Sequence, residues 1–257
     1  MGEETPNYGS PTAHIVVNLL LGFILLLFGL LGAYLLNFLF LLFAVPSIYF
    51  FYVARGWAKG GLLKDKLRIR EDFIRLVGVK DGERILDVGT GSGFLAIGFA
   101  KEMRCGEVVG IDVWMPFGGG TSLKNAERNA EIEGVSEIVR FRRADAREIP
   151  YPDYYFDRVV ACFVIHIIRG WEKAVEEMVR VLKPGGVFAV LEPKKGWAGG
   201  WRVNRELKDK LEEFGLENVS FKPFTIFIQG RGRFFLLLEL KVRRLINELL
   251  QYEHRSF

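Results

Sequence analysis

The sequence predicts an α/β domain preceded by an N-terminal helical hairpin, and three observations lead to this prediction. Apolar, strand-like segments alternate with helical ones between residues 84 and 193. The first of these strands runs directly into a glycine-rich turn at 84–94, RILDVGTGSGF. An uncharged apolar run covers residues 13–54. With 257 residues, the chain is long enough for one α/β domain of ordinary size and a small addition.

Composition narrows the class of protein only partly. Half of the residues are hydrophobic, and the mean hydropathy of +0.17 is high for a soluble protein. The net charge of +4 suits an anionic membrane surface as well as nucleic acid, so it selects neither. Cys105 and Cys162 lie far apart and have no zinc-type spacing. We therefore predict no metal site and no disulfide framework, and a reducing compartment is the simpler interpretation.

The apolar run is too long for a single membrane helix. Its roughly 40 residues would form a helix about 60 Å long, twice the ~30 Å of a hydrocarbon core. Two spans, near His14–Gly32 and Leu36–Ala54, fit better, with the turn at Gly32–Tyr34 and Asn37. One strongly tilted span, a re-entrant hairpin and a buried core helix are the alternatives.

Basic residues follow the apolar run, and by the positive-inside rule this flank is cytoplasmic. Glu3 and Glu4 precede the run, where a cleaved signal peptide would be basic, so we predict an anchor that is retained. Residues 56–76 predict an amphipathic helix that lies on the membrane surface or packs on the next domain. The basic residues of the flank are Arg55, Lys59, Lys64, Lys66, Arg68 and Arg70.

The glycine-rich turn indicates a nucleotide-like ligand. A strand, a glycine-rich turn and a helix together direct backbone N–H groups and a helix N-terminus at a ligand. The third glycine, Gly93, comes one residue too early for the GxGxxG dinucleotide fingerprint, and no Gly-Lys-Ser/Thr follows as in a P-loop. Asp112 ends a second strand about 20 residues beyond the turn, where Rossmann-like units place a ribose-binding acid.

Four segments occur in an order and spacing that one family shares: ILDVGTGSGF, GIDV, ADAREIPYPDYYFDRVVACFVIHII and EEMVRVLKPGGVFAVLEP. Together they resemble the class I S-adenosylmethionine (SAM) dependent methyltransferases, and closely the ubiquinone/menaquinone-biosynthesis C-methyltransferases, over about residues 70–195. The resemblance implies methyl transfer with SAM as cofactor and a Rossmann-like, seven-stranded sheet. A helix over 204–215 and a hairpin of two strands around GRGR (230–233) would complete that sheet.

The resemblance also implies a role for each strand end. The turn after the first strand surrounds the methionine part of SAM, and Asp112 binds the ribose. Either Val113 or Trp114 covers the adenine, and Asp145 with Ala146 meets its edge. Cys162 and Phe163, at the end of the fourth strand, lie near the sulfonium. The simpler alternative is a turn-forming or helix-capping acid for Asp87, an exposed acid at a strand end for Asp112, and a turn-initiating acid for Asp145. The implied SAM-binding residues are Asp87, Gly89, Thr90, Gly91, Gly93, Asp112, Val113, Trp114, Asp145, Ala146, Cys162 and Phe163.

His166, just after the fourth strand, is the candidate catalytic residue, although a histidine among apolar residues is more often packed than catalytic. A general base is needed only if the acceptor must lose a proton, since the sulfonium is already a good leaving group. Cys162 has no basic partner in the sequence and is not predicted to be a nucleophile. The loop after Trp114, MPFGGGTS, is predicted to be a lid, a substrate loop or a plain linker.

The predicted function is that of an integral membrane methyltransferase with a cytoplasmic catalytic domain. Its predicted partners are the lipid bilayer and a hydrophobic small-molecule or lipid acceptor, because tethering raises the effective concentration near the bilayer. The ending ACFVIH differs from the Asn/Asp-Pro-Pro-aromatic turn of base methyltransferases, which argues against nucleic acid. Methylation of proteins stays open, as does a non-catalytic, membrane-tethered SAM-binding role, and the sequence does not indicate an oligomeric state.

The predicted domain organisation follows from these segments. It comprises an N-terminal tail (1–12), a transmembrane segment (13–55), the juxtamembrane helix (56–76), the methyltransferase domain (77–245) and a C-terminal tail (246–257).

Overall fold

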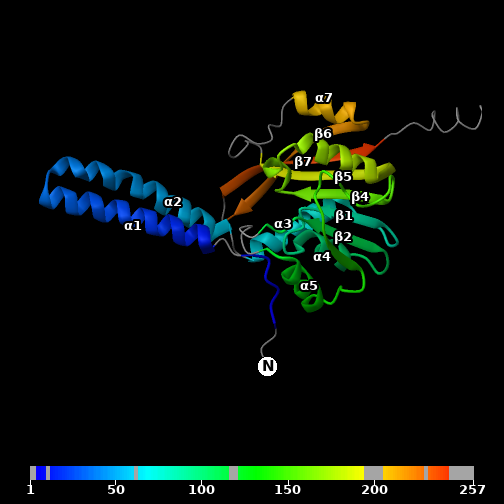
Figure 1. The fold of residues 1–257 in the computed structure, drawn as a ribbon, viewed down its shortest axis with the longest axis horizontal. Helices are drawn as coiled ribbons and strands as arrows, with labels where there is room; N and C mark the ends of the chain where they lie inside the picture. The colour runs from blue at the N-terminus through cyan, green and yellow to red at the C-terminus, as the bar shows by residue number, and fades with distance from the viewer. Residues whose placement is uncertain are drawn as a thin grey trace, which may run out of the picture.

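A computed structural model describes residues 4–9, 12–60, 63–115, 121–193, 205–228 and 231–242. They form an α/β domain and a helical hairpin that projects from one end of it (Figure 1). The glycine-rich part of the loop after Trp114, the loop over 194–204 and the tail from residue 243 lie outside the described residues.

The hairpin consists of α1 (Thr12–Leu35), the 3-10 helix η1 (Phe38–Phe43) and α2 (Ala44–Gly60). The turn between them lies at Leu36 and Asn37, whose side chain accepts the N–H of Leu39 at 2.9 Å and begins η1. Of the residues predicted for the turn, Asn37 therefore lies in it, whereas the prediction was wrong for Gly32–Tyr34, which belong to α1. Gly32 instead allows a close helix contact, since a Cβ there would lie 2.3 Å from a ring carbon of Phe40.

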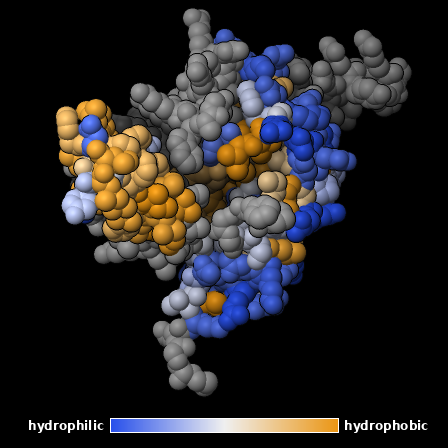
Figure 2. Space-filling model, turned by 60° about the vertical axis from the view of Figure 1, so that its left-hand side comes forward, coloured by the Kyte–Doolittle hydropathy of each residue, from blue (hydrophilic) through white to orange (hydrophobic). Residues whose placement is uncertain are grey.

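Both arms of the hairpin are long and apolar enough to cross a membrane, judged by length and composition alone: Ile15–Leu35 and Phe38–Arg55. Most of their apolar side chains are exposed, and Figure 2 shows them as a continuous hydrophobic surface. A core helix of a soluble protein would have these side chains covered, so the structure does not support that alternative.

The helix α3 (Leu63–Val77) joins the hairpin to the α/β domain. The predicted juxtamembrane segment over 56–76 therefore begins within α2, which continues through Gly60. Phe73, Ile74 and Val77 are buried against the domain. Of the two interpretations of this helix, packing on the next domain is therefore the one that the structure supports, and contact with the membrane surface stays a prediction.

The sheet has the strand order β3-β2-β1-β4-β5-β7-β6. The first five strands of the chain run parallel, which confirms the predicted α/β methyltransferase core. At one edge of the sheet, β7 runs antiparallel to both of its neighbours, β5 and β6. The strands are β1 (Arg84–Val88), β2 (Glu107–Asp112), β3 (Val139–Arg143), β4 (Phe156–Cys162), β5 (Leu182–Pro193), β6 (Leu216–Ile228) and β7 (Arg231–Val242).

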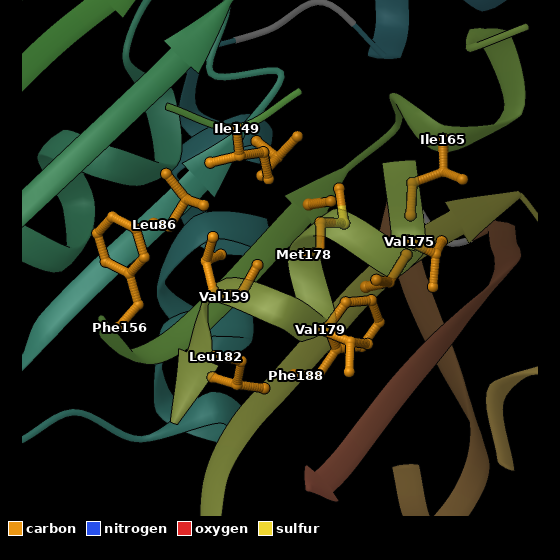
Figure 3. Close-up of a cluster of buried hydrophobic side chains, with 14 of the residues drawn as sticks. Leu86, Ile149, Phe156, Val159, Ile165, Val175, Met178, Val179, Leu182 and Phe188 are labelled. Carbon is orange, nitrogen blue, oxygen red and sulfur yellow. The ribbon is translucent and has the colours of Figure 1, made fainter. Parts of the chain in front are cut away.

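Helices cover both faces of the sheet (Figure 1). One hydrophobic cluster packs α3, α4 (Phe94–Lys101) and α5 (Leu123–Ile132) on one face. The other packs α6 (Trp171–Val181) and α7 (Arg205–Glu213) on the opposite face, where Met178 and Val175 meet Val159 and Phe188 (Figure 3). The two cores hold the strands in register, so the strand ends are fixed points from which loops extend.

The turn predicted at Pro-Gly-Gly takes an unusual form. Leu182 pairs with Phe156 and Val187 pairs with Arg158, so residues 183–186 bulge out of the ladder between α6 and the rest of β5. The bulge keeps β5 parallel to β4 and carries its far end to the same edge as the glycine-rich turn.

Candidate active site

The candidate site lies at the carboxyl ends of β1, β2 and β4. The chain runs from β1 outward to β2 and β3 and then returns to β4 on the other side of β1. Such a reversal of strand order leaves a crevice at the carboxyl ends, where α/β proteins bind ligands. The predicted site residues follow β1, β2, β3 and β4, and the fold therefore brings them to one edge of the sheet.

The turn after β1 requires its glycines. Gly89, Gly91 and Gly93 have φ of +73°, +58° and +80°, which side chains rarely adopt. A Cβ on Gly89 would also lie 2.3 Å from Val164, and one on Gly93 would lie 2.7 Å from Phe141. A Cβ on Gly91 would lie 3.4 Å from Thr121, which is an ordinary contact, so Gly91 is required by its backbone conformation and not by a collision.

Asp87 supports the turn from below. Its buried carboxylate accepts the Thr90 hydroxyl at 2.7 Å and the N–H of Ala96, in the first turn of α4, at 3.1 Å. Burial raises the pKa of Asp87 to about 7, although these hydrogen bonds act in the opposite direction. In this arrangement Asp87 shapes the turn, and the backbone of the turn is the part that a ligand can reach. We call the turn over Gly89–Gly93, together with Asp112, the cradle.

Asp112 closes the other side of the cradle. One carboxylate oxygen accepts the N–H of Gly91 at 2.9 Å and the other accepts the N–H of Trp114 at 2.8 Å. The half-buried carboxylate is thus fixed at the end of β2, and its remaining lone pairs are suited to a pair of ribose hydroxyls.

The two candidates for an adenine contact differ in exposure. The indole N–H of Trp114 donates to the carbonyl of Gly91 at 2.7 Å, and the ring is buried against the turn. Val113 is 42% exposed. Val113 is therefore the residue that offers free surface at this point, whereas Trp114 ties β2 to the turn.

Asp145 has a partner that sequence reasoning missed. The guanidinium of Arg147 pairs with its carboxylate at 2.6 Å and lowers the pKa of Asp145. Ala146 lies against the core, and Ala144 donates its N–H to the Asp112 carbonyl. The residues after β3 thus begin beside Asp112, and the Asp145 carboxylate that was predicted to face the adenine is paired with Arg147.

The end of β4 lies within one residue of the predicted end of the fourth strand at Cys162 and Phe163. β4 ends at Cys162, Phe163 has φ of +54°, and Ile165–Ile167 form the 3-10 helix η2. Burial and the neighbouring Asp87 and Glu192 raise the pKa of the Cys162 thiol well above its usual range. The thiol is therefore uncharged, in agreement with the prediction that it is no nucleophile.

Glu192, at the end of β5, is the second residue that sequence reasoning missed. It is 1% exposed, and one carboxylate oxygen accepts the N–H groups of Val164 and Ile165 at 2.9 and 2.7 Å. Its other oxygen lies 2.6 Å from Nδ1 of His166. A charged residue at the end of the apolar strand FAVLEP was the signal that could have revealed it.

The described residues hold no group of three or more His, Cys, Asp or Glu side chains that could bind a metal ion. What they form is a glycine-rich turn, a fixed carboxylate at the end of β2 and a buried carboxylate under the turn. These groups fit a nucleoside that carries an amino-acid tail.

Comparisons with known proteins indicate the class to which this site belongs. Residues 86–190 match the family described as "Methyltransferase domain". Over 145 residues the chain is 39% identical to a ubiquinone/menaquinone biosynthesis C-methyltransferase of Pseudomonas fluorescens, covering 54% of this chain and 55% of that protein. It is 41% identical over 136 residues to a demethylmenaquinone methyltransferase of Thermus thermophilus, covering 52% and 59%. The chain thus spans a little over half the length of these curated relatives.

A crystal structure of a SAM-dependent methyltransferase from Aquifex aeolicus has the same fold, with a TM-score of 0.52 and 24% sequence identity. The match covers 67% of this chain and 89% of that one. The strand order and the match over residues 86–190 together indicate an α/β methyltransferase domain that resembles the SAM-dependent methyltransferases. This domain is related by sequence to quinone C-methyltransferases and by fold to the wider class.

Proposed function

We propose that the protein is a membrane-anchored methyltransferase that transfers the methyl group of SAM to a hydrophobic or membrane-associated small molecule or lipid. The catalytic domain faces the cytoplasm, and α1 and α2 cross the bilayer as a hairpin. SAM supplies an electrophilic methyl group, and the residues of the crevice hold it, orient the acceptor and exclude water.

The observation that carries this proposal is that both ends of the hairpin are tied to the methyltransferase domain. Before α1, the Asn7 N–H donates to the Asn129 side chain on α5 at 2.7 Å. After α2, Lys66 on α3 donates to the Gly9 carbonyl at 2.8 Å, and Arg70 contacts the Tyr8 hydroxyl at 3.2 Å. The chain therefore leaves the domain and returns to it, which supports two crossings and argues against a single span.

The surface around the crevice supports an apolar acceptor. Among the α/β-domain residues whose side chains are described, the exposed large hydrophobic ones are Val113, Met115, Tyr154 and Ile167. All but Tyr154 follow β2 or β4, at the edge that carries the SAM cradle. Figure 2 shows hydrophobic surface on the α/β domain as well as on the hairpin. An apolar molecule that enters from the bilayer would find matching surface on both parts of the molecule.

The names of the relatives refine this proposal. They refer to ubiquinone and menaquinone biosynthesis and to demethylmenaquinone. We infer an acceptor of the same chemical kind, a reduced quinone ring with a lipid tail. The hairpin then keeps the crevice next to the membrane in which such a tail is dissolved.

The test uses the full-length protein in lipid nanodiscs with radiolabelled SAM and reduced demethylmenaquinone. We expect label in the organic phase, and less of it with Asp112→Asn. Label in the protein or nucleic-acid phase of a membrane extract would overturn the proposed acceptor in favour of those classes. Binding of SAM without transfer to any phase would favour a non-catalytic SAM-binding protein.

A further inference from the structure

The pair His166–Glu192 lies outside the groups that form the SAM cradle. Glu192 is held by three donors: the N–H groups of Val164 and Ile165 and the His166 ring. These partners span the whole connection from β4 into η2. The carboxylate therefore fixes both the path of this connection and the orientation of the imidazole that it carries.

The hydrogen bonds decide the tautomer of His166. A carboxylate only accepts hydrogen bonds, so the ring nitrogen 2.6 Å from Glu192, Nδ1, carries the proton. In the neutral ring, Nε2 then has a free lone pair. A buried carboxylate that orients a histidine in this way is the arrangement found where histidine acts as a base.

The segment that carries His166 packs against the glycine-rich turn, and the His166 side chain is partly exposed. Val164 packs so closely on the turn that a Cβ on Gly89 would collide with it. The His166 side chain is 12% exposed, and its neighbour Ile167 is 69% exposed. His166 therefore belongs to a segment that runs from the glycine-rich turn at Val164 to the exposed apolar side chain of Ile167.

We propose that His166 is a general base that takes a proton from the acceptor, and that Glu192 is its positioning residue. The acceptor class is then one with an acidic hydroxyl or an activated C–H, such as a hydroxyaryl or hydroquinone ring. The acceptor's proton bonds to Nε2, its freed electron pair bonds to the methyl carbon, and the pair of the methyl–sulfur bond stays on sulfur. This inference rests on the proposed function and names its substrate chemistry.

Glu192→Gln is the most informative variant, because it keeps the shape of the side chain and reverses the direction of its hydrogen bond to Nδ1 of His166. The amide oxygen still accepts the two backbone N–H groups, but the amide NH2 must then donate to Nδ1. We expect the proton to move to Nε2, so that the ring cannot act as a base. His166→Gln removes the base itself, and His254→Gln is the control at a histidine outside the described residues.

The first readout does not depend on turnover. The chain has three histidines, so nitrogen NMR of histidine-labelled, full-length protein in nanodiscs resolves each ring, with the glutamine variants as assignments. We expect the Nδ1–H tautomer for His166 in the wild type and the Nε2–H tautomer in Glu192→Gln. An Nε2–H tautomer in the wild type would overturn the proposal.

The second readout is methyl transfer to reduced demethylmenaquinone. We expect both variants to bind SAM within about twofold of the wild type by calorimetry, and to lose transfer by about 10²–10⁴-fold.

The two proposals fail in different ways. If the wild type binds SAM but does not methylate this probe, the quinone acceptor is wrong, and the tautomer still decides the role of the pair. If the wild type is active and both variants keep its rate, His166 is only a packing residue and the inference is overturned.

Discussion

Two aspartates at neighbouring strand ends have different environments and therefore different tasks. Asp87 is buried and supports the turn, whereas Asp112 is half-buried and faces the crevice. Their sequence contexts are alike, because both end an apolar strand. Only the hydrogen bonds of the folded chain separate the residue that builds the cradle from the one that a ligand reaches.

Asp87→Asn tests the supporting role through the pH dependence of stability. The pKa of Asp87 is raised from 3.8 to about 7, so between these values the folded state binds more protons than the unfolded state. The free energy of unfolding must therefore fall as pH rises through this window. We expect Asp87→Asn to gain stability relative to the wild type between pH 4 and 7, measured by thermal unfolding at each pH. A difference that does not change with pH would contradict this assignment.

Asp112→Asn tests the ligand-facing role. The amide keeps one acceptor oxygen but loses the charge and the second acceptor, so Gly91 and Trp114 can no longer both be held. We expect SAM binding to weaken at least about tenfold, or about 1.4 kcal/mol, by calorimetry. The control is Glu102→Gln, at the end of α4 remote from the turn, which should bind SAM as the wild type does. Equal affinity in both variants would remove Asp112 from the site.

At the scale of elements, the sequence predicted what depends on local pattern and missed what depends on distant partners. The turn at Gly89–Gly93 was predictable because its glycines follow directly from backbone conformation. The path of the chain after β4 was not, because the acceptor that holds the N–H groups of Val164 and Ile165, Glu192, belongs to another strand. For the same reason the sequence identified His166 as a candidate but not the carboxylate that orients it.

The hairpin turn shows the same limit. Glycine is common in turns, and Gly32 was assigned to one, but the turn is set by the capping side chain of Asn37. Gly32 lies in α1 and lets Phe40 approach the helix backbone. Small residues have this role where two apolar helices pack closely.

Gly32→Ala tests whether Gly32 is needed for the close approach of Phe40 or only occupies an ordinary helix position. In an unstrained helix the change would stabilise by about 0.5–1 kcal/mol through helix propensity. Here the new methyl would lie 2.3 Å from the Phe40 ring, so we expect a loss of about 1–3 kcal/mol instead. Thermal unfolding in one detergent measures it, and Gly32→Ala with Phe40→Ala should lose less than the sum of the single variants. Strict additivity would show that the contact does not limit packing.

At the scale of the whole molecule, the segment over residues 4–9 fixes the hairpin on the catalytic domain. Tyr8 lies between Arg70 of α3 and Glu133 at the end of α5, and the Arg70 guanidinium lies 5.6 Å from the Tyr8 ring and 5.4 Å from the Phe94 ring. Asn129, which accepts the Asn7 N–H, also donates to the Ser92 carbonyl in the glycine turn. The hairpin and the glycine-rich turn are thus connected through one layer of side chains.

This connection makes a definite prediction for topology, since residues 4–9 and 63–77 must lie on the same side of the membrane. Tyr34 is 86% exposed, near the end of the hairpin remote from the α/β domain, and Cys105 is exposed on that domain. In intact cells we expect a membrane-impermeant maleimide to label Tyr34→Cys but not wild-type Cys105, and to label Cys105 only after lysis. Tyr34→Cys in a Cys105→Ser background is the matched control. Absence of label at both sites before lysis would indicate a re-entrant hairpin, and label at Cys105 in intact cells would place the catalytic domain outside.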